Sequence, residues 1–399
     1  MQNFLKIFKV AKKQYVLYNN WGDFMSEPIR ILNLFTIMNR GGAETMVMNY
    51  YRNIDKSKVQ FDFLVHRQER GAYDDEIEAM GGRIYRMCPI YPQNFGKYKK
   101  MLKVFFDEHP EYKILHSHMS ELGCYAFMEA HKRGIKVKIC HAHNAPYGFD
   151  FKTILREYFK LRIRPYCSHM FMCGYSSGEW LFGKKNSKHF IQVNNAIDVQ
   201  NFKYNQKVSS KIREELSISE DALVFGHIGR FNTQKNHSFL IDIFNEIQKK
   251  REDSVLLLVG NGDLEKEIKN KVKILGIESK VLFLGVRDDI NRIIQSFDVF
   301  LFPSLFEGLG IVLIEAQAAG IPCITSEKVV AKEAAITNLL NYYPLEKDAK
   351  DWADRALELT KIVKTDTTKN IAAAGFDIKA NAKWLQEFYL TAYSQKYKD

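Results

Sequence analysis

The stretch that decides the fold is Phe302-Pro303-Ser304-Leu305-Phe306-Glu307-Gly308-Leu309-Gly310-Ile311-Val312-Leu313-Ile314-Glu315. It follows an apolar run at 298–301 that is typical of a buried strand, and it leads into an apolar helix that we expect to end at Gly320. A glycine-rich turn between a strand and a helix leaves free backbone amides at the positive end of the helix. The turn at Gly308, Leu309 and Gly310 therefore favours an anionic group such as phosphate.

Two carboxylates flank this turn, Glu307 before it and Glu315 in the helix that follows, eight residues apart. Eight residues of helix span about 12 Å. A carboxylate cannot profitably face a phosphate, but it can accept two hydrogen bonds from neighbouring hydroxyls of a sugar. A ligand with a sugar at each end and phosphate in the middle fits this arrangement, and a sugar nucleotide has that form.

The cations that a diphosphate needs occur upstream, after the expected strand at 222–228. Arg230 offers a bidentate guanidinium and Lys235 a point charge, so that both can meet one anion across a turn. Any one of these charged residues alone would usually be a solvated surface residue. Glu315 argues against that alternative, because its helix is apolar nearly all round and a buried carboxylate is costly unless it is bonded.

At these residues the sequence resembles the retaining GT-B glycosyltransferases of the glycosyltransferase group 1 family, which includes the glycogen synthases. The resemblance rests on Gly-Arg-x4-Lys at Gly229, Arg230 and Lys235, followed by Glu-x7-Glu at Glu307 and Glu315. Each pattern alone is weak, but the two stand in the family's order. The runs 326–333 and 345–352 look like the branch that builds bacterial exopolysaccharide and capsule.

The resemblance implies an α/β GT-B fold, two doubly wound Rossmann-like domains with a cleft between them. It also implies that Arg230 and Lys235 stabilise the leaving diphosphate, that Glu307 orients the donor sugar, and that no side chain acts as a nucleophile. Glu315 would bind the ribose, and the backbone at Val286 and Arg287 the nucleobase. The expected catalytic residues are Arg230, Lys235, Glu307 and His118; the expected donor-binding residues are Gly41, Gly42, Gly229, Arg230, Lys235, Val286, Arg287, Glu307, Gly308, Leu309, Gly310 and Glu315.

Alternating strands and helices predict two parallel, doubly wound sheets with ligands at the carboxyl ends of the strands. We expect an N-terminal extension at 1–24, an acceptor-side domain at 25–200, a nucleotide-sugar domain at 201–376, and a helix at 377–399 that crosses back to the first domain, as in similar proteins. The expected strands lie near 29–35, 61–65, 113–117, 136–140, 169–173 and 189–193, and then near 222–228, 254–259, 280–284, 298–302 and 321–325.

The first domain has its own group of polar residues. Gly41 and Gly42 enter a helix after the first strand, and in the family this loop lies against the donor phosphates or the acceptor. His116 and His118 end one expected strand, and His141 and His143 end the next. Two His-x-His pairs could bind a metal, but GT-B enzymes generally use fixed cations, so we expect no metal and no cofactor. By resemblance His118 contacts the donor sugar, with His143 a weaker candidate and His116 and His141 in supporting roles.

Composition and charge restrict the class of protein. The six cysteines show no metal-ligand spacing and are typical of a reduced cytoplasmic protein. The net charge of +11 falls entirely within residues 1–200. Residues 151–164 predict an amphipathic basic helix that suits an anionic membrane surface or a lipid-diphosphate acceptor, while a solvated helix is the plainer alternative. Nucleic acid is a poorer partner, because no binding motif accompanies the charge.

The sequence thus predicts a retaining, metal-independent glycosyltransferase that moves a sugar from a nucleotide-diphosphate donor to a saccharide or lipid-linked saccharide acceptor. Among the donors, a UDP-sugar is the one expected. The enzyme would act in the cytoplasm, at the inner face of the membrane, in exopolysaccharide or capsule synthesis. Two alternatives remain open. One is another enzyme on the same scaffold, an epimerase or a phosphorylase; the other is a non-catalytic saccharide-binding protein at a membrane surface.

Overall fold

The computed structural model describes residues 27–143 and 151–397, so the predicted extension at 1–24 lies outside the described residues. The described residues form two compact units. The first unit contains the chain up to Ala196 and again from Ile378, and the second contains Ile197–Asp377. The sequence placed these divisions after residues 200 and 376.

In the described part of the first unit, seven parallel strands form one sheet in the order β3-β2-β1-β4-β5-β6-β7. Side chains alternate between the two faces of a strand, and in the interior strand β1 Ile31 and Phe35 enter one core while Leu32 and Leu34 enter the other. The strands are β1 (Ile29–Phe35), β2 (Val59–Val65), β3 (Ile84–Arg86), β4 (Ile114–Ser117), β5 (Val137–Ala142), β6 (His169–Met172) and β7 (Phe190–Gln192).

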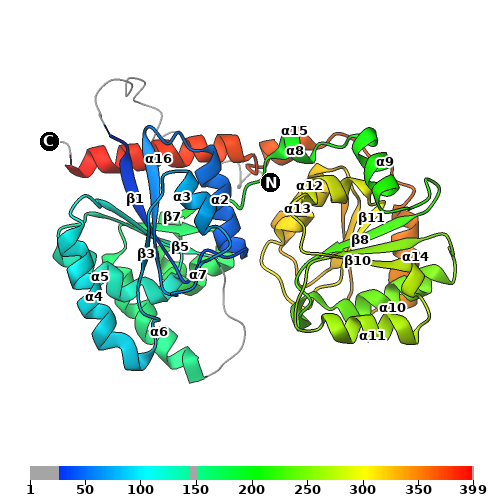
Figure 1. Ribbon diagram of the computed structural model, residues 1–399, viewed down its shortest axis with the longest axis horizontal. Coiled ribbons are helices and arrows are strands. Elements are labelled where there is room, and N and C mark those ends of the chain that lie inside the picture. The colour runs from blue at the N-terminus through cyan, green and yellow to red at the C-terminus, as the bar shows by residue number, and fades with distance from the viewer. Residues whose placement is uncertain (1–26, 144–150, 398–399) are drawn as a thin grey trace. The chain divides into compact units, whose positions relative to one another are not determined.

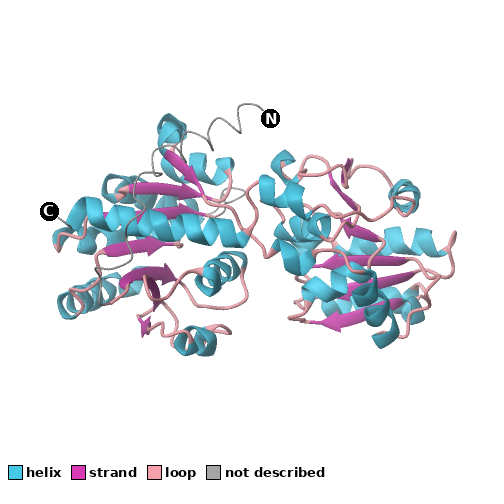
Figure 2. Ribbon diagram, turned by 90° about the horizontal axis from the view of Figure 1, so that it is seen from above, coloured by secondary structure: helices cyan, strands magenta, loops and turns pink. Residues whose placement is uncertain are grey.

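Helices cover both faces of this sheet (Figures 1 and 2). The C-terminal helix α16 places Leu385, Phe388 and Tyr389 in the same core as Ile31 and Phe35, so it is part of the first unit although it comes last in the chain. The helices are α2 (Gly42–Asn53), α3 (Asp74–Ala79), α4 (Phe95–Glu108), α5 (Cys124–Lys132), α6 (Phe151–Ile163), α7 (Tyr175–Phe182) and α16 (Ile378–Tyr397).

The second unit repeats the plan with six parallel strands among its described residues, in the order β10-β9-β8-β11-β12-β13. Its strands are β8 (Val224–Ile228), β9 (Val255–Val259), β10 (Val281–Gly285), β11 (Val299–Phe302), β12 (Cys323–Ser326) and β13 (Leu340–Tyr343). Its helices are α8 (Val199–Phe202), α9 (Gln206–Glu215), α10 (His237–Gln248), α11 (Glu265–Ile274), α12 (Ile290–Ile293), α13 (Ile311–Ala318), α14 (Ala349–Leu359) and α15 (Thr368–Ala373).

Two strands were missed by the sequence prediction, β3 and β13, and both lie at an edge of their sheet. The three residues of β3 are only partly buried, and β13 has a single fully buried residue, Leu340. A short strand with one partner and little burial carries a weak hydrophobic pattern, which is why the sequence does not reveal it.

The order of the strands places one switch point in each sheet. In the first unit the chain builds outward from β1 on one side and then returns to β4 on the other; in the second it does the same at β8 and β11. Ligands of doubly wound sheets bind at the carboxyl ends of the strands beside such a point. Ligands are therefore expected at the loops after β8 and β11 and at those after β1 and β4.

Candidate functional site

Two loops of the second unit meet at its switch point, the arginine loop (residues 229–236, after β8) and the glycine loop (residues 303–310, after β11). The amide of Leu305 donates to the Gln234 carbonyl at 2.8 Å, and the Gln234 side chain donates to the Phe306 carbonyl at 2.9 Å. Asn236 adds a bond to the Pro303 carbonyl at 3.1 Å. The two motifs recognised in the sequence thus form one site.

A glycine turn after β9 holds the arginine loop in place. The amides of Gly229 and Phe231 donate to the carbonyls of Val259 and Asn261, both at 2.9 Å. Gly260 has φ +129°, and a Cβ there would collide with the Gly229 carbonyl oxygen. Glycine is required because the turn lies directly against the loop that carries Arg230.

Lys235 and Glu307, one from each loop, form an ion pair. Their side chains are 16% and 7% exposed, and the Lys235 ammonium lies 4.6 Å from the centre of the Phe302 ring. The low exposure strengthens the electrostatic interaction relative to a surface pair. An anion that binds Lys235 must therefore share it with Glu307 or replace Glu307 as its partner.

Arg230 differs from Lys235 in having no partner. Its side chain is exposed, and within the described residues it makes no hydrogen bond or ion pair. A guanidinium offers five donors in a planar fork that matches phosphate oxygens. Of the two predicted cations, Arg230 is the one that can accept an anion without losing a protein contact.

Glu315 lies on α13, partly buried, and its carboxyl group has no hydrogen-bond partner among the described residues. Burial disfavours the charged form and raises the pKa of Glu315 to about 7. This is not the environment of a solvated surface carboxylate. Donors supplied by a ligand, such as sugar hydroxyls, would stabilise the ionised form that the protein itself leaves unsupported.

The glycine loop ends at Gly310, which caps α13 in the left-handed conformation (φ 68°, ψ 72°). The amides of Gly308, Leu309 and Gly310 donate no hydrogen bond within the described residues. Free amides at the positive end of a helix attract an anion. The turn thus has the features that the sequence analysis expected of a phosphate site.

Val286 and Arg287 follow β10 on the same sheet. Val286 is 53% exposed, and Arg287 is paired with Asp289 of its own loop at 2.8 Å. The side chain of Arg287 is therefore occupied locally, so a role in nucleobase binding would fall to the backbone, as the resemblance implies.

In the first unit, Gly41 caps α2 and Gly42 is its first residue. The Glu44 carboxylate folds back over Gly41, where a Cβ would collide with it. Burial raises the pKa of Glu44. Because a carboxylate already lies at this turn, a phosphate would be repelled there unless Glu44 moved or became protonated.

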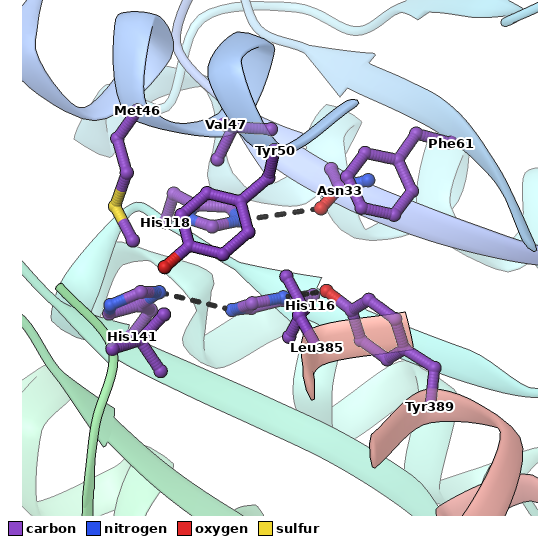
Figure 3. A pocket seen from close by; sticks show the side chains of 11 residues that line it. Asn33, Met46, Val47, Tyr50, Phe61, His116, His118, His141, Leu385 and Tyr389 are labelled. Carbon is purple, nitrogen blue, oxygen red and sulfur yellow. Dashed lines mark hydrogen bonds between the residues drawn. The ribbon is translucent and has the colours of Figure 1, made fainter. Parts of the chain in front are cut away.

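The four histidines predicted from the two His-x-His pairs lie together at the carboxyl ends of β4 and β5. Both ring nitrogens of His118 are engaged, Nδ1 with His143 Nε2 at 2.9 Å and Nε2 with Asn33 Oδ1 at 3.3 Å. Figure 3 shows His118 beside Asn33, and His116 between His141 and Tyr389. His118 can therefore bind a sugar only by exchanging one of these partners for the ligand.

Three members of this cluster were missed by the sequence analysis, Asn33 on β1, Cys173 just after β6, and Tyr389 on α16. Cys173 Sγ lies 3.4 Å from His141 Nε2 and 3.2 Å from His143 Nδ1. The sequence signal that could have identified Cys173 is its position, since it directly follows the strand that pairs with the one carrying His141. In the described residues, His116/His118/His141 and His141/His143/Cys173 are two groups of metal-ligand type whose atoms lie within 4.8 Å.

The predicted basic helix is α6, which ends at Ile163, so that Arg164 lies just beyond it. Its predicted cations are largely engaged: Lys160 pairs with Glu157, and Arg164 donates to the Leu181 carbonyl at 2.9 Å. Phe159 and Ile163 are buried. The outer face instead carries apolar side chains, Ile154 (70% exposed), Tyr158 (49%) and Leu161 (62%).

Comparisons with known proteins agree with this geometry. The family described as "Glycosyl transferases group 1" matches residues 208–373. A Bacillus subtilis (strain 168) protein named "Putative glycosyltransferase EpsF" is 34% identical over 370 residues, which cover 90% of this chain and 96% of that protein. The chain belongs to the glycosyltransferase group 1 family. It is a glycosyltransferase, and the predicted family is confirmed.

Other relatives indicate which branch of the family the chain resembles. The Staphylococcus aureus "Capsular polysaccharide biosynthesis glycosyltransferase CapH" is 24% identical, covering 91% of this glycosyltransferase and 99% of CapH. An Escherichia coli "UDP-Gal:alpha-D-GlcNAc-diphosphoundecaprenol alpha-1,3-galactosyltransferase" is 25% identical, covering 83% of this chain and 89% of that enzyme. The expected similarity to enzymes of polysaccharide synthesis is confirmed.

The fold is also found among solved structures. Anabaena Alr3699/HepE, solved in complex with UDP and glucose, superposes with a TM-score of 0.73 at 18% identity, covering 91% of this glycosyltransferase and all of that chain. The predicted fold of two doubly wound α/β domains is confirmed. Among the described residues, none of the helices is long and apolar enough to cross a membrane.

Proposed function

We propose that this glycosyltransferase transfers a sugar from a nucleoside diphosphate to a hydroxyl of a lipid-linked saccharide, with retention of the anomeric configuration and without a metal ion. The observation that carries the proposal is the meeting of the arginine and glycine loops at the switch point of the second unit. One site there contains a lysine–glutamate pair together with a guanidinium, backbone amides and a carboxyl group that have no partner within residues 27–143 and 151–397.

Each group has a role that its chemistry supports. Arg230 and the amides at Gly308–Gly310 would bind the diphosphate, and Lys235 would leave Glu307 to follow the negative charge that grows on the leaving group. Glu307, released from Lys235, would then accept a hydroxyl of the donor sugar. Glu315 would accept the two ribose hydroxyls, which compensate its burial.

The donor is proposed to be a UDP-sugar. The E. coli relative is named for UDP-Gal, and HepE was solved with UDP and glucose. The loop of Val286 and Arg287 would contact the base through its backbone.

Metal independence is supported by the fixed positive charge of Arg230, Lys235 and the N-terminus of α13, which replaces the charge that a divalent cation would supply. Retention is supported by the family resemblance that the Gly-Arg-x4-Lys and Glu-x7-Glu patterns carry. The anomeric configuration of the first product formed, read by NMR, tests retention directly.

The acceptor is proposed to bind the first unit. Glu44 beside Gly41 makes the turn at α2 better suited to a hydroxyl than to a phosphate. The exposed apolar residues of α6 lie in the half of the chain that carries the whole net charge of +11. An exposed apolar face in a basic half of the chain favours an anionic membrane, where a lipid-linked saccharide would be held.

The experiment that tests this function is a donor and acceptor screen. Purified protein is incubated with a panel of sugar nucleotides, with and without lipid-diphosphate-linked saccharides, and free nucleoside diphosphate is measured. Release that requires the acceptor supports transfer. An epimerase would change the donor without an acceptor, and a phosphorylase would show a bound aldimine; the relatives reported above, all named glycosyltransferases, favour neither.

A further inference from the structure

Seven side chains of the first unit form one continuous series of hydrogen bonds, which we term the imidazole network. It runs from Tyr389 on α16 through the four histidines and Cys173 to Asn33 on β1. The successive contacts are Tyr389–His116 (2.7 Å), His116–His141 (3.3 Å), His141–Cys173 (3.4 Å), Cys173–His143 (3.2 Å), His143–His118 (2.9 Å) and His118–Asn33 (3.3 Å). Three of these bonds are visible in Figure 3.

The direction of the series is set at Asn33. Its Nδ2 faces two backbone carbonyls, those of Ile31 (3.3 Å) and Asp62 (3.4 Å). Only the NH₂ group can donate to carbonyls, so the orientation of this amide is fixed by its surroundings. Oδ1 must therefore face His118 Nε2, and since that oxygen can only accept, His118 Nε2 carries the proton.

Burial keeps the rings uncharged. It lowers the pKa of His116, His118 and His141 well below the ordinary value, and that of His143 to about 4. A neutral imidazole has one N–H and one acceptor nitrogen. Each ring must consequently donate in one direction of the series and accept from the other.

The orientation of the Asn33 amide then determines which atom carries the proton in every hydrogen bond of the series. His118 Nδ1 accepts from His143 Nε2, and His143 Nδ1 accepts from the Cys173 thiol. The other acceptor within reach of this thiol, Met46 Sδ, is farther away at 3.8 Å. The sulfur accepts from His141 Nε2. His141 Nδ1 accepts from His116 Nε2, and His116 Nδ1 accepts from the Tyr389 hydroxyl. Every donor and acceptor is satisfied, whereas the reverse direction would set two lone pairs against each other at Asn33.

We propose that the imidazole network holds all four histidines as neutral Nε2–H tautomers and thereby makes His118 a hydrogen-bond donor, with Cys173 as the positioning residue that joins the two histidine pairs. A ligand oxygen that displaces Asn33 finds an N–H at His118 without any rearrangement. A ligand hydroxyl that donates there would require all the bonds to reverse. The assignment of that ligand as the donor sugar rests on the proposed function; the tautomers do not.

A metal ion at His141, His143 and Cys173 would conflict with this geometry. The two rings stack, with centres 4.3 Å apart and planes 27° apart. The atoms that a metal would need there, His141 Nε2, His143 Nδ1 and Cys173 Sγ, are already hydrogen-bonded to one another, so a metal would have to replace both bonds and remove the thiol proton. The adjoining cavity has a volume of about 10 Å³, which is the space that one water molecule needs.

The decisive experiment is two-bond ¹H–¹⁵N correlation NMR on protein labelled at histidine, with the signals assigned by single histidine substitutions and the metal content measured in parallel. We expect Nε2–H tautomers at His116, His118, His141 and His143, and no stoichiometric metal. An Nδ1–H tautomer or a doubly protonated ring at any of the four, or one bound metal ion per chain, would overturn the proposal. None of these readings depends on the protein being active.

A second experiment connects the network to turnover. Cys173→Ala interrupts the series, and we expect turnover to fall roughly tenfold, the scale of one lost hydrogen bond, with mixed tautomers at His116 and His141. Cys173→Ser keeps a donor and an acceptor and should restore both. Cys140→Ala, which removes another fully buried thiol of the same unit, is the matched control. Equal turnover in the Ala and Ser variants of Cys173 would refute its role as a positioning residue.

Discussion

The raised pKa of Glu315 has a measurable consequence for nucleotide binding. The free protein holds this carboxyl near its midpoint at neutral pH, because burial raises its pKa to about 7. If two ribose hydroxyls donate to the carboxylate, the bound form must be ionised, and binding must lower the pKa. Binding then releases protons, so affinity for the nucleoside diphosphate is predicted to rise with pH.

The size of the effect follows from the fraction of Glu315 that is ionised before binding. With a pKa of about 7, that fraction is roughly 0.9 at pH 8, half at pH 7 and roughly 0.1 at pH 6. Affinity should therefore fall about tenfold between pH 8 and pH 6, which corresponds to about 1.4 kcal/mol. At pH 7, binding should release about half a proton from this group.

Isothermal titration calorimetry in buffers of different ionisation enthalpy measures both quantities. The diphosphate has its own titration in this range, so the comparison that isolates Glu315 is with Glu315→Gln, which keeps the shape of the side chain but cannot ionise. The wild type should release about half a proton more than the variant at pH 7. Identical proton release and an identical pH slope in the two proteins would refute the assignment of Glu315 to the ribose.

Four further predictions follow from the same structure. Arg230→Ala should lower turnover about 10²-fold or more, the scale of losing one oxyanion donor, and near-normal turnover in the folded variant would exclude Arg230 from the phosphate site. Activity should survive an excess of chelator, because the positive charge is built in; loss that Mg²⁺ or Mn²⁺ restores would contradict this. The double variant Ile154→Ser/Leu161→Ser should bind anionic vesicles more weakly than the wild type. The control Val363→Ser, which alters another exposed apolar residue (80%), should bind them as the wild type does. Equal binding by the wild type and both variants would show that α6 is a solvated helix that does not contact the membrane. The free energy of unfolding should decline as pH falls from about 6.5 toward 4, because the buried histidines, such as His143 with its pKa of about 4, bind protons in this range only after unfolding. The slope per histidine is ~1.4 kcal/mol per pH unit. A free energy of unfolding that does not change over this pH range would contradict the assignment of the four histidines as neutral.

The sequence predicted the donor loops well, because their signals are local. Gly229, Arg230 and Lys235 follow one buried strand, and Glu307 and the glycine turn follow another, and parallel strands bring their carboxyl ends to one edge of a sheet. The ion pair between Lys235 and Glu307 could not be foreseen, since it depends on how closely two loops 72 positions apart approach each other.

The members of the histidine cluster could be predicted from the sequence only in part. The two His-x-His pairs were visible as repeats at strand ends, but Cys173 and Tyr389 are single residues with no motif around them, and only the tertiary structure brings them to the rings. The amphipathic helix at α6 was recognised correctly, but the sequence could not show that Lys160 and Arg164 are engaged by neighbouring segments of the first unit, because those contacts depend on tertiary packing.

The central claim is that the arginine and glycine loops bind a nucleotide sugar so that its sugar can pass to an acceptor. The most direct measurement is the release of nucleoside diphosphate from a UDP-sugar, with and without a lipid-diphosphate-linked saccharide, by the wild type and by Arg230→Ala. Release is expected to require the acceptor and to fall about 10²-fold in the variant. Acceptor-dependent release that persists at the wild-type rate in Arg230→Ala, or the absence of release with every donor and acceptor of the panel, would contradict it.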